Sequence, residues 1–462
     1  MLSTLLLVLC LAFRGPWVKA DPSSAPRDET KLHELALINP LNLKSSARIA
    51  PGNYTLPAAA GKAVIEIDGD NVVLDLTGVT LNRGVQQPWE REGIGVHAAG
   101  HSHLTIRSGA IRGYRFGILI QGGEDLRVIG SDVSENRSQK LLSTDSHYDE
   151  GDWVDIFHLD AWESYGAGLY LKDVRGAYLE NILGQNEQNG VMLANVTHAT
   201  VMACNLSHNS GWGIALYRSS WNELLDNHAD WDVRCEGKTY SAGCDSAGVL
   251  LIDGSNHNRV IGNSFAHSGD GYFVSKPETG ASSDSNYVAF NDGSFSPHIA
   301  FESTFTADDQ FFHNIADHSD YGFWLGYSRD TSVIDNHIEG SQRDGIAIEH
   351  GTGNIIARNQ ILRNGTAGIH LFHHAAALDD PSREYSILEN LIGGNLAGIA
   401  LEQTTDVTIT GNNFVNNDVG VRAQNGSARV VLHANRFFPR GCAGGGGQST
   451  RHGRTVEGSG WA

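Results

Sequence analysis

The chain has 462 residues, with 33 Lys or Arg and 53 Asp or Glu, which gives a formal net charge of −20 at pH 7. This acidity argues against a nucleic acid partner, because binding to phosphates needs clustered Lys and Arg. Beyond the first 20 residues no apolar segment is long enough to span a bilayer, so we expect no transmembrane span.

Residues 1–20 have the features of a secretory signal peptide. The apolar run LLLVLCLAF is followed by Val18, Lys19 and Ala20, which provide a plausible cleavage site. We therefore predict a secreted or periplasmic protein. Residues 21–47 are expected to be a polar leader, with a short helix at residues 31–38 that caps the N-terminal end of the fold.

From residue 48 onward one phrase recurs: Gly, an aliphatic residue, any residue, an aliphatic residue, then a polar stretch that ends in Asn. Between Gly168 and Gly420 the copies read GLYLKD, GVMLAN, GIALYR, GVLLID, GYFVSK, GFWLGY, GIAIEH, GIHLFH, GIALEQ and GVRAQN. PHIAFES is interpreted as a degenerate copy in which His298 takes the place of Gly. A period of about 20 to 25 residues with one alternating strand per repeat is typical of a solenoid.

A column of asparagines recurs with the same period. Its members are Asn314, Asn336, Asn359, Asn390, Asn412 and Asn435. Stacked Asn side chains satisfy backbone groups at a buried corner, so we interpret this column as structural.

These repeats resemble those of the right-handed parallel β-helix, the pectin-lyase-like fold with the short repeats of NosD-like and carbohydrate-binding/sugar-hydrolase domains. The resemblance covers residues 48–437 and implies an all-β, single-stranded parallel β-helix in one domain. One fold hosts many functions, so the resemblance leaves the activity open. Residues 438–462 are Gly-rich and lack apolar periodicity, which predicts a disordered tail. We expect a monomer.

Insertions interrupt the repeat in three places, and loops of this kind carry function on a rigid scaffold. They lie between Asn136 and Gly168, between Asn227 and Gly248, and between Phe372 and Leu388. We expect them to form walls on both sides of a groove over the G-I-x-L strands. Cys235 and Cys244 bracket the second insertion, and a disulfide between them suits an exported protein better than a zinc site, since no second Cys/His pair stands at ligand spacing.

The outward-facing residues of the strands can be read by aligning the repeats. The first outward column reads Tyr170, Met192, Ala215, Leu250, Phe273, Ala300, Trp324, Ala347, His370, Ala400 and Arg422. The next column reads Lys172, Ala194, Tyr217, Ile252, Ser275, Glu302, Gly326, Glu349, Phe372, Glu402 and Gln424. Aromatic rings mixed with polar groups suit a sugar-binding groove. The predicted sugar contacts are Trp324, Tyr327, Phe372, Phe273, Tyr217, Arg218 and Lys276.

Three glutamates are the leading candidates for acid–base catalysis. Glu302, Glu349 and Glu402 are each two repeats from the next, which places their backbones about 9 to 10 Å apart and allows separations like those of glycosidase carboxyl groups. His370 and His373 lie on the repeat between Glu349 and Glu402 and could transfer protons. The alternative is that these glutamates are simply solvated.

The first insertion is strongly acidic. It has no Lys or Arg between Lys140 and Lys172, while Asp and Glu recur throughout. Asp155, His158 and Asp160 could hold Ca²⁺ or a transition metal. No fixed ligand spacing is present, so a solvated loop pinned by its aromatic residues is the alternative.

Two classes of function are consistent with these features. The first is an exported enzyme acting on a polysaccharide, as a glycoside hydrolase, lyase or epimerase. The second is a noncatalytic β-helix, either a glycan-binding surface protein or a NosD-like accessory protein. Scattered basic residues disfavour an anionic substrate, and three Met residues are few for a copper role. The composition of the expected groove favours the enzyme.

Overall fold

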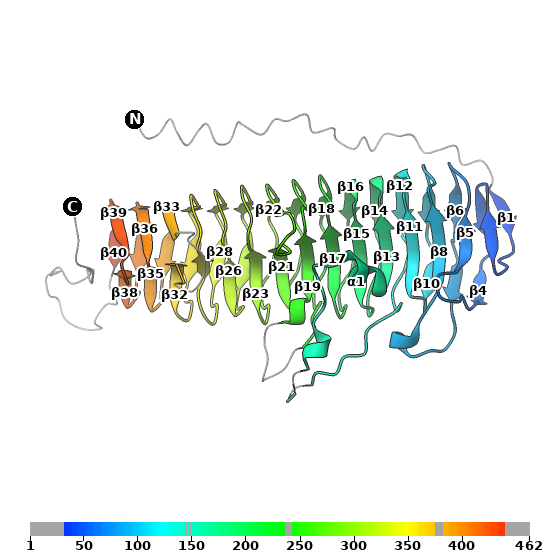
Figure 1. Ribbon diagram of the computed structural model, residues 1–462, viewed down its shortest axis with the longest axis horizontal. Helices are drawn as coiled ribbons and strands as arrows, with labels where there is room; N and C mark the ends of the chain where they lie inside the picture. The colour runs from blue at the N-terminus through cyan, green and yellow to red at the C-terminus, as the bar shows by residue number, and fades with distance from the viewer. Residues whose placement is uncertain (1–31, 145, 148, 236–242, 375–381, 439–462) are drawn as a thin grey trace.

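The chain coils into a rod whose strands lie parallel to those of the turns before and after, so that each turn forms one rung (Figure 1). The computed structural model describes residues 32–144, 146–147, 149–235, 243–374 and 382–438. The predicted signal peptide, most of the leader and residues 439–462 of the predicted tail lie outside the described residues. No helix within the described ranges has the length and apolarity needed to cross a membrane.

The G-I-x-L phrases form a sheet of 15 strands, here called the first sheet. Its strands are β2 (Leu41–Leu43), β5 (Ala63–Ile67), β8 (Ile94–Ala99), β11 (Phe116–Gln121), β13 (Ala167–Lys172), β15 (Asn189–Ala194), β17 (Trp212–Tyr217), β19 (Ala247–Ile252), β21 (Asp270–Ser275), β23 (Ile299–Ser303), β26 (Tyr321–Trp324), β29 (Ile346–Glu349), β32 (Ala367–Phe372), β35 (Ala397–Glu402) and β38 (Val419–Gln424).

The second sheet has 16 strands and follows the first sheet in most rungs. It contains β1 (His33–Leu35), β3 (Ala47–Ile49), β6 (Val73–Asp75), β9 (Thr105–Arg107), β12 (Glu124–Ile129), β14 (Arg175–Glu180), β16 (Thr197–Met202), β18 (Glu223–Leu225), β20 (Arg259–Ile261), β22 (Tyr287–Ala289), β24 (Gln310–Phe312), β27 (Ser332–Ile334), β30 (Ile355–Ala357), β33 (Ser382–Leu388), β36 (Thr404–Thr410) and β39 (Ala428–His433).

The third side of the rod is built from two shorter sheets, of three and six strands. The shorter one contains β4 (Gly52–Thr55), β7 (Val79–Asn82) and β10 (Ala110–Arg112), and the longer one contains β25 (Ile315–Asp317), β28 (His337–Glu339), β31 (Gln360–Leu362), β34 (Leu391–Gly393), β37 (Asn413–Val415) and β40 (Arg436–Phe438). The described helices are short: α1 (Leu159–Ser164), η1 (Pro88–Glu90), η2 (Glu150–Asp152) and η3 (Gly243–Asp245).

The aliphatic residues of the repeats stack inside the rod, as predicted. Ile346 pairs with Ile369, and Ile369 pairs with Ile399, along the interior face of the first sheet. These side chains and those of Ile348 and Leu371 are fully buried. The repeat glycines are explained by the close approach of the next rung, since a Cβ on Gly322 would stand 2.5 Å from the carbonyl oxygen of Gly345.

The asparagine column forms a hydrogen-bonded ladder, which confirms its structural interpretation. The Nδ2 of Asn314 donates to Oδ1 of Asn336 at 3.1 Å, and the Nδ2 of Asn336 donates to Oδ1 of Asn359 at 3.0 Å. The same Oδ1 atoms accept backbone amides, as between the amide of Asn314 and Asn336 at 2.8 Å. The ladder therefore satisfies buried polar groups rung after rung.

A second ladder, which has Asn258 and Asn286 on the preceding rungs, contains a carboxylate at Asp309. Asp309 is fully buried, and its carboxylate accepts hydrogen bonds from the backbone amide of Asn286 and from the hydroxyl of Ser303, both at 2.8 Å. Burial raises the pKa of Asp309 to about 7, although these hydrogen bonds act in the opposite direction.

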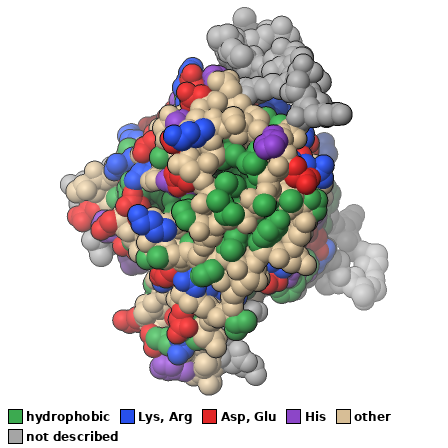
Figure 2. All heavy atoms as spheres, turned by 90° about the vertical axis from the view of Figure 1, so that its right-hand side faces the viewer, with side chains coloured by type: hydrophobic (Ala, Val, Ile, Leu, Met, Phe, Trp, Pro, Cys, Tyr) green, Lys and Arg blue, Asp and Glu red, His purple; other side chains and the backbone are tan. Residues whose placement is uncertain are grey.

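The start of the rod differs from the sequence prediction. Residues 33–35, expected to lie in a helix, form β1, which pairs in parallel with β3. The β-helix therefore begins before residue 48. Figure 2 views the rod from this end, where hydrophobic side chains gather near the centre of the end face.

The degenerate repeat has a different register from the one predicted. Tyr272 pairs with Phe301, and Phe301 pairs with Phe323, so Ala300 rather than His298 takes the place of the repeat glycine. As a result Glu302 lies in the first outward column, between Phe273 and Trp324. The two-residue error arose because the repeat has no Gly to mark its start.

Candidate functional site

The outer face of the first sheet is divided into a covered half and an open half. Over the covered half, residues 149–166, here called the cover, lie against the strands. Trp162 on α1 is fully buried, and its ring centroid is 4.6 Å from that of Trp212 and 5.3 Å from that of Tyr217. The outward residues beneath form an apolar cluster with the cover, containing Phe116, Tyr170, Met192, Ala215, Leu250, Ile252 and Phe273.

The second insertion contacts the cover and holds it against the sheet. Cys235 and Cys244 are joined in a disulfide with a Cα–Cα distance of 5.8 Å, which confirms that prediction. The backbone amide of Val154 donates to the carbonyl oxygen of Cys244 at 3.4 Å. Arg234 is buried beside the disulfide and donates to Gln139, and burial lowers the pKa of its guanidinium to about 10. The two insertions thus form one cap.

We expected the first two insertions to form the walls of an open groove. That expectation is wrong, because they fill the N-terminal half of the groove instead. Tyr217 and Phe273, predicted as sugar contacts, are 3% and 5% exposed within the covered cluster. Their ring faces are therefore not available to a ligand. Within the third insertion, residues 375–381 lie outside the described residues.

Two predicted basic contacts lie near the edge of the same sheet. The guanidinium of Arg218 forms an ion pair with Asp253 at 2.6 Å and lies 5.1 Å from the centre of the Tyr217 ring. The Nζ of Lys276 lies 5.9 Å from the centre of the Phe305 ring. Both cations thus line the boundary between the first and second sheets rather than the middle of the groove.

The open half begins with an acidic centre around His298. The Nδ1 of His298 is 2.8 Å from Oδ1 of Asp270, whose side chain is buried. One ligand atom each from Asp270, His298 and Glu302 lies within 4.8 Å of the other two. Asp245, the residue after Cys244, is close enough to interact electrostatically with both Asp270 and His298.

These groups shift one another's pKa values. Burial and the nearby charge of Asp270 raise the pKa of Glu302 well above its ordinary range, and they raise that of Asp245 to about 7. Burial alone would lower the pKa of His298, but Asp270 and Glu302 together raise it to about 9. The centre therefore holds protons that exposed carboxylates would have released.

An aromatic platform lies on the next rung. Glu302 pairs with Trp324, which is partly exposed, and the Trp324 ring meets Tyr321 edge-on at a centroid distance of 5.0 Å. Arg343 lies 5.3 Å from the centre of the Tyr321 ring and forms an ion pair with Asp320 at 3.3 Å.

A second imidazole–carboxylate centre follows three rungs after the first. The Nδ1 of His370 is 3.0 Å from Oδ2 of Asp344, and Nε2 of His370 is 3.8 Å from Oε1 of Glu402. Asp344 also accepts hydrogen bonds from Thr366 and from the amide of Ala367. Burial acts to raise the pKa of Asp344, but the hydrogen bonds from His370 and Thr366 outweigh it and leave the pKa lowered. Within the described part of the chain, Nε2 of His370 is buried and has no hydrogen-bond partner.

The remaining predicted residues surround this centre. Phe372 stacks on His370 with a ring distance of 4.5 Å and meets the Trp324 ring edge-on at 6.0 Å. Phe372 pairs with Glu349 on one side and with Glu402 on the other, so the two glutamates lie two rungs apart, as predicted. Gln424 donates to Oε1 of Glu402 at 2.5 Å.

Tyr327 and His373 lie at the edge of the groove. The rings of Phe305, Tyr327 and His350 stack at 4.6 and 4.7 Å along the turn after the first sheet. The His373 ring lies 4.3 Å from that of His350, and His350 is 3.6 Å from Glu349. These rings therefore support the side of the groove on which Glu349 lies.

The predicted metal site in the first insertion is only partly assembled. The Nδ1 of His158 is 2.9 Å from Oδ2 of Asp155, and that hydrogen bond raises the pKa of His158. Asp160 does not complete a set of three ligand atoms with them. Over the described ranges, only Asp270, His298 and Glu302 place one ligand atom each within 4.8 Å of the other two. Calcium or transition-metal binding by Asp155, His158 and Asp160 stays a prediction.

The sequence analysis missed the aspartates that hold the two histidines. Asp270 and Asp344 each stand immediately before a repeat glycine, in DGYFV and DGIAI. The aligned columns began after that glycine, so neither residue was considered. An acidic residue in this position in two repeats was the signal that could have revealed them.

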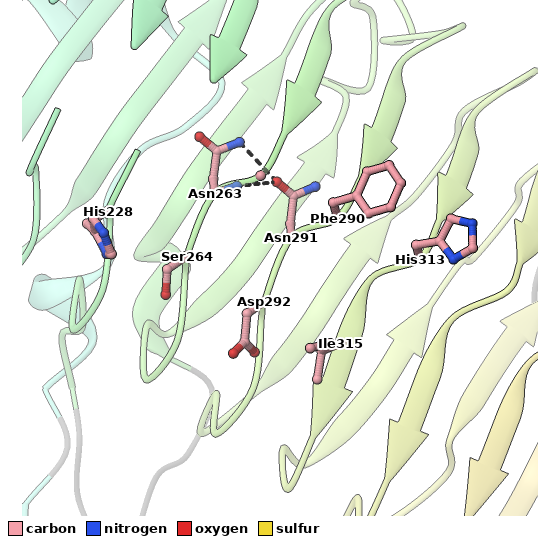
Figure 3. Close-up of a pocket in the computed structure, with 9 residues that line it drawn as sticks. His228, Asn263, Ser264, Phe290, Asn291, Asp292, His313 and Ile315 are labelled. Carbon is pink, nitrogen blue, oxygen red and sulfur yellow. Dashed lines mark hydrogen bonds between the residues drawn. The ribbon is translucent and has the colours of Figure 1, made fainter. Parts of the chain in front are cut away.

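A shallow cavity of about 410 Å³ lies outside the groove, where the third side of the rod begins (Figure 3). Phe290 and His313 stack at its rim with a ring distance of 5.0 Å, and Ser264, Asp292 and Ile315 line it on successive rungs. Asn263 and Asn291 at its back belong to the asparagine ladder. The cavity brings together no pair of acid and base groups comparable with those of the groove.

Comparisons with known proteins agree with the observed architecture. A family model described as "Right handed beta helix region" matches residues 63–265 and 242–437. No curated protein matches the chain. Among solved structures, the A-module of mannuronan C-5 epimerase AlgE4 from Azotobacter vinelandii is 13% identical, with a TM-score of 0.41 and coverage of 86% of this chain and 87% of that one.

Two further structures show the same general likeness. A variant of the periplasmic alginate epimerase AlgG is 13% identical, with a TM-score of 0.37 and coverage of 84% of this chain and 77% of that one. Tailspike protein 3 of bacteriophage CBA120 is 11% identical, with a TM-score of 0.28 and coverage of 90% and 56%. At these identities the likeness concerns the fold alone.

Proposed function

The chain belongs to the right-handed β-helix family. From that premise we propose that it is an exported enzyme that binds a polysaccharide in the open groove. We propose that it hydrolyses the polysaccharide by acid–base chemistry. The fold supplies the scaffold and does not define the reaction, so the proposal depends on the side chains of the open half.

The main support for the proposal is the position of His370 between the carboxyl groups of Asp344 and Glu402. Asp344 fixes one imidazole nitrogen of His370, and the other nitrogen lies 3.8 Å from the carboxylate of Glu402 without a hydrogen bond among the described residues. A carboxylate that orients an imidazole selects its tautomer and keeps its second nitrogen available for proton exchange. His370 can therefore deliver a proton to Glu402, or remove one from it.

Glu349 supplies the second carboxyl group. It lies two rungs from Glu402, with Phe372 between them, so their backbones are about 9 to 10 Å apart. Carboxyl groups separated by about 6.5 to 9.5 Å suit inverting hydrolysis, in which one protonates the glycosidic oxygen and the other activates water. We assign the proton donor to Glu402, beside His370, and the base to Glu349.

Trp324 and Phe372 would hold the sugar. Both side chains are partly exposed on the outer face of the open half, and their rings meet edge-on. Aromatic faces stack on the apolar faces of sugar rings, while the surrounding carboxylates accept hydrogen bonds from hydroxyl groups.

The charge of the open half favours a neutral substrate. Its acidic side chains are Asp270, Glu302, Asp320, Asp344, Glu349 and Glu402, of which Asp270 is paired with His298 and Glu302 has a raised pKa. Arg343 is a cation near the platform, and it is already paired with Asp320. A uronate polymer would meet repulsion there, since like charges brought together in a groove disfavour binding.

The test is to incubate the purified mature chain with a panel of neutral and uronate polysaccharides, with and without a chelator. We expect reducing ends to appear from a neutral polymer. Glu402→Gln and Glu349→Gln should each slow their release by roughly two to four orders of magnitude, the usual contribution of a general acid or base. Absorbance from unsaturated uronates would instead identify a lyase, and binding without turnover would identify a noncatalytic glycan-binding protein.

Glu66 and His97 provide a matched control on the same sheet. They form an equivalent carboxylate–imidazole pair at 2.7 Å on β5 and β8, far from the open half. Glu66→Gln and His97→Gln should leave turnover unchanged. A loss as large as that of Glu402→Gln would show that the assay reports folding rather than chemistry.

A further inference from the structure

We propose that Asp270, His298 and Glu302 form a binding site for a divalent transition-metal ion, with zinc as the best-fitting candidate, at the point where the cap ends and the open groove begins. No residue of this site belongs to the Asp344–His370–Glu402 centre. The inference concerns metal binding alone and can be tested without a substrate.

The three side chains offer a mixed set of donors. One imidazole nitrogen and one oxygen from each of two carboxylates lie within 4.8 Å of one another. Zinc binds imidazole nitrogen and carboxylate oxygen at about 2.0 to 2.2 Å, and sites with three protein ligands leave a fourth position for water. Small rotations of the side chains would bring the donors to these distances. The imidazole favours zinc over calcium or magnesium, which prefer oxygen alone.

The backbone holds the donors in place from two adjacent rungs. Asp270 begins β21, where its carboxylate accepts the backbone amide of Ile299 at 3.1 Å as well as facing the His298 ring. Glu302 is on β23, the strand that pairs with β21. Since both strands belong to one hydrogen-bonded sheet, the site is preorganised rather than assembled from loose loops.

Within the described ranges, no Lys or Arg forms an ion pair with these carboxyl groups. Among the described side chains, the ion pair formed by Asp270 is with His298, and neither Glu302 nor Asp245 has an ion pair with Lys or Arg. Asp245 brings a further carboxyl group close to the centre, held by the disulfide-bonded loop and by a hydrogen bond from Trp212 to its carbonyl oxygen at 2.9 Å. His298 is the basic group that faces these carboxyl groups, and a bound divalent ion would add further positive charge among them.

The second histidine centre serves as an internal contrast. There, Asp344 is satisfied by Thr366 and the amide of Ala367 in addition to His370, and Glu402 is held by Gln424. By comparison, the carboxylate of Glu302 has no hydrogen bond with another described residue, so it is available as a ligand. Trp324 is one rung away from this centre, so a metal bound there would be close to the aromatic platform.

The experiment is a calorimetric titration of zinc into the full mature chain, after treatment with a chelator and dialysis. We expect one tight site per chain. His298→Gln and Glu302→Gln should each weaken it at least tenfold, while their circular dichroism and melting temperature stay close to those of the parent protein. His370→Gln and Glu402→Gln are matched controls from the other centre and should keep the parent affinity.

Three results would overturn the proposal. The first is the absence of a tight site in the parent protein. The second is an unchanged tight site in both His298→Gln and Glu302→Gln. The third is loss of the site in His158→Gln, which would place the metal in the first insertion instead. Because glycan turnover is not measured, failure here leaves the proposed hydrolysis standing, and failure of hydrolysis leaves the metal site standing.

Discussion

The covered and open halves of the first sheet share one backbone and differ in their outward residues. Under the cap, the first outward column carries Tyr170, Met192, Ala215 and Leu250, all fully buried or nearly so. From β23 onward the same column carries Glu302, Trp324, Ala347, His370, Ala400 and Arg422, so that polar and aromatic residues are interspersed with alanines. The interior residues remain aliphatic or aromatic in both halves. The repeat therefore specifies the core, the inserted segments determine which rungs are covered, and the outward residues determine which groups an open rung presents to a ligand.

The largest expected effect concerns the cap. Trp162 is fully buried against Trp212, so Trp162→Ala should destabilise docking of the cap by about 3 to 5 kcal/mol, as for other large aromatic truncations in cores. Hydrogen exchange measured by mass spectrometry should show faster exchange in the cover and unchanged exchange in β29, β32 and β35. If exchange became equally faster in the cover and in β29, β32 and β35, the division of the first sheet into a covered and an open half would be contradicted.

The fold was predictable because its signal repeats. Aliphatic residues at fixed positions and the asparagine column recur in nearly every rung, so single exceptions do not hide the pattern. Where a repeat lost its glycine, at Ala300, the predicted register was wrong by two residues. At residues 33–35 a helix was expected because the segment stands outside the repeat, yet the exposed end of the first rung makes a strand favourable there.

The site was predictable only in part, for a different reason. Alternation predicted that Glu349, His370, Phe372 and Glu402 lie on the outer face, and the strand pairing agrees with that placement. Asp344 and Asp270 were missed because their roles depend on contacts between neighbouring rungs. Burial of Tyr217 and Phe273 could not be predicted either, since it results from how the inserted segments pack, and those segments follow no repeat.

The second largest expected effect is a pH dependence of the free energy of unfolding, caused by the buried carboxyl group of Asp309. Between about pH 4 and pH 7 the folded protein keeps the proton of Asp309, whose pKa is raised to about 7, while the unfolded chain has released it. Stability should therefore fall as the pH rises through this interval and then stay level. Asp309→Asn should remove this dependence, with a gain at pH 8 of at most about 4 kcal/mol.

Thermal melting at several pH values measures this effect. The parent protein and Asp309→Asn should converge near pH 4 and separate toward pH 8. A stability difference that does not change with pH would show that Asp309 titrates normally in the folded protein.

The smallest expected effect concerns the platform of the open half. Trp324→Ala should weaken binding of a glycan about tenfold, in line with the loss of one stacking contact, and should change stability little because the ring is partly exposed. Trp221, which is 45% exposed and lies on another side of the rod, provides the control. Trp221→Ala should leave affinity unchanged in the same titration.

Hydroxyl-radical footprinting, with and without a bound glycan, tests the central claim that the open half holds the polysaccharide. We predict that the ligand protects Trp324, Tyr321 and Phe372 from oxidation and leaves Phe290, exposed where the second sheet meets the third side, unchanged. Protection of Phe290 without protection of Trp324 would contradict the account and place the glycan outside the groove.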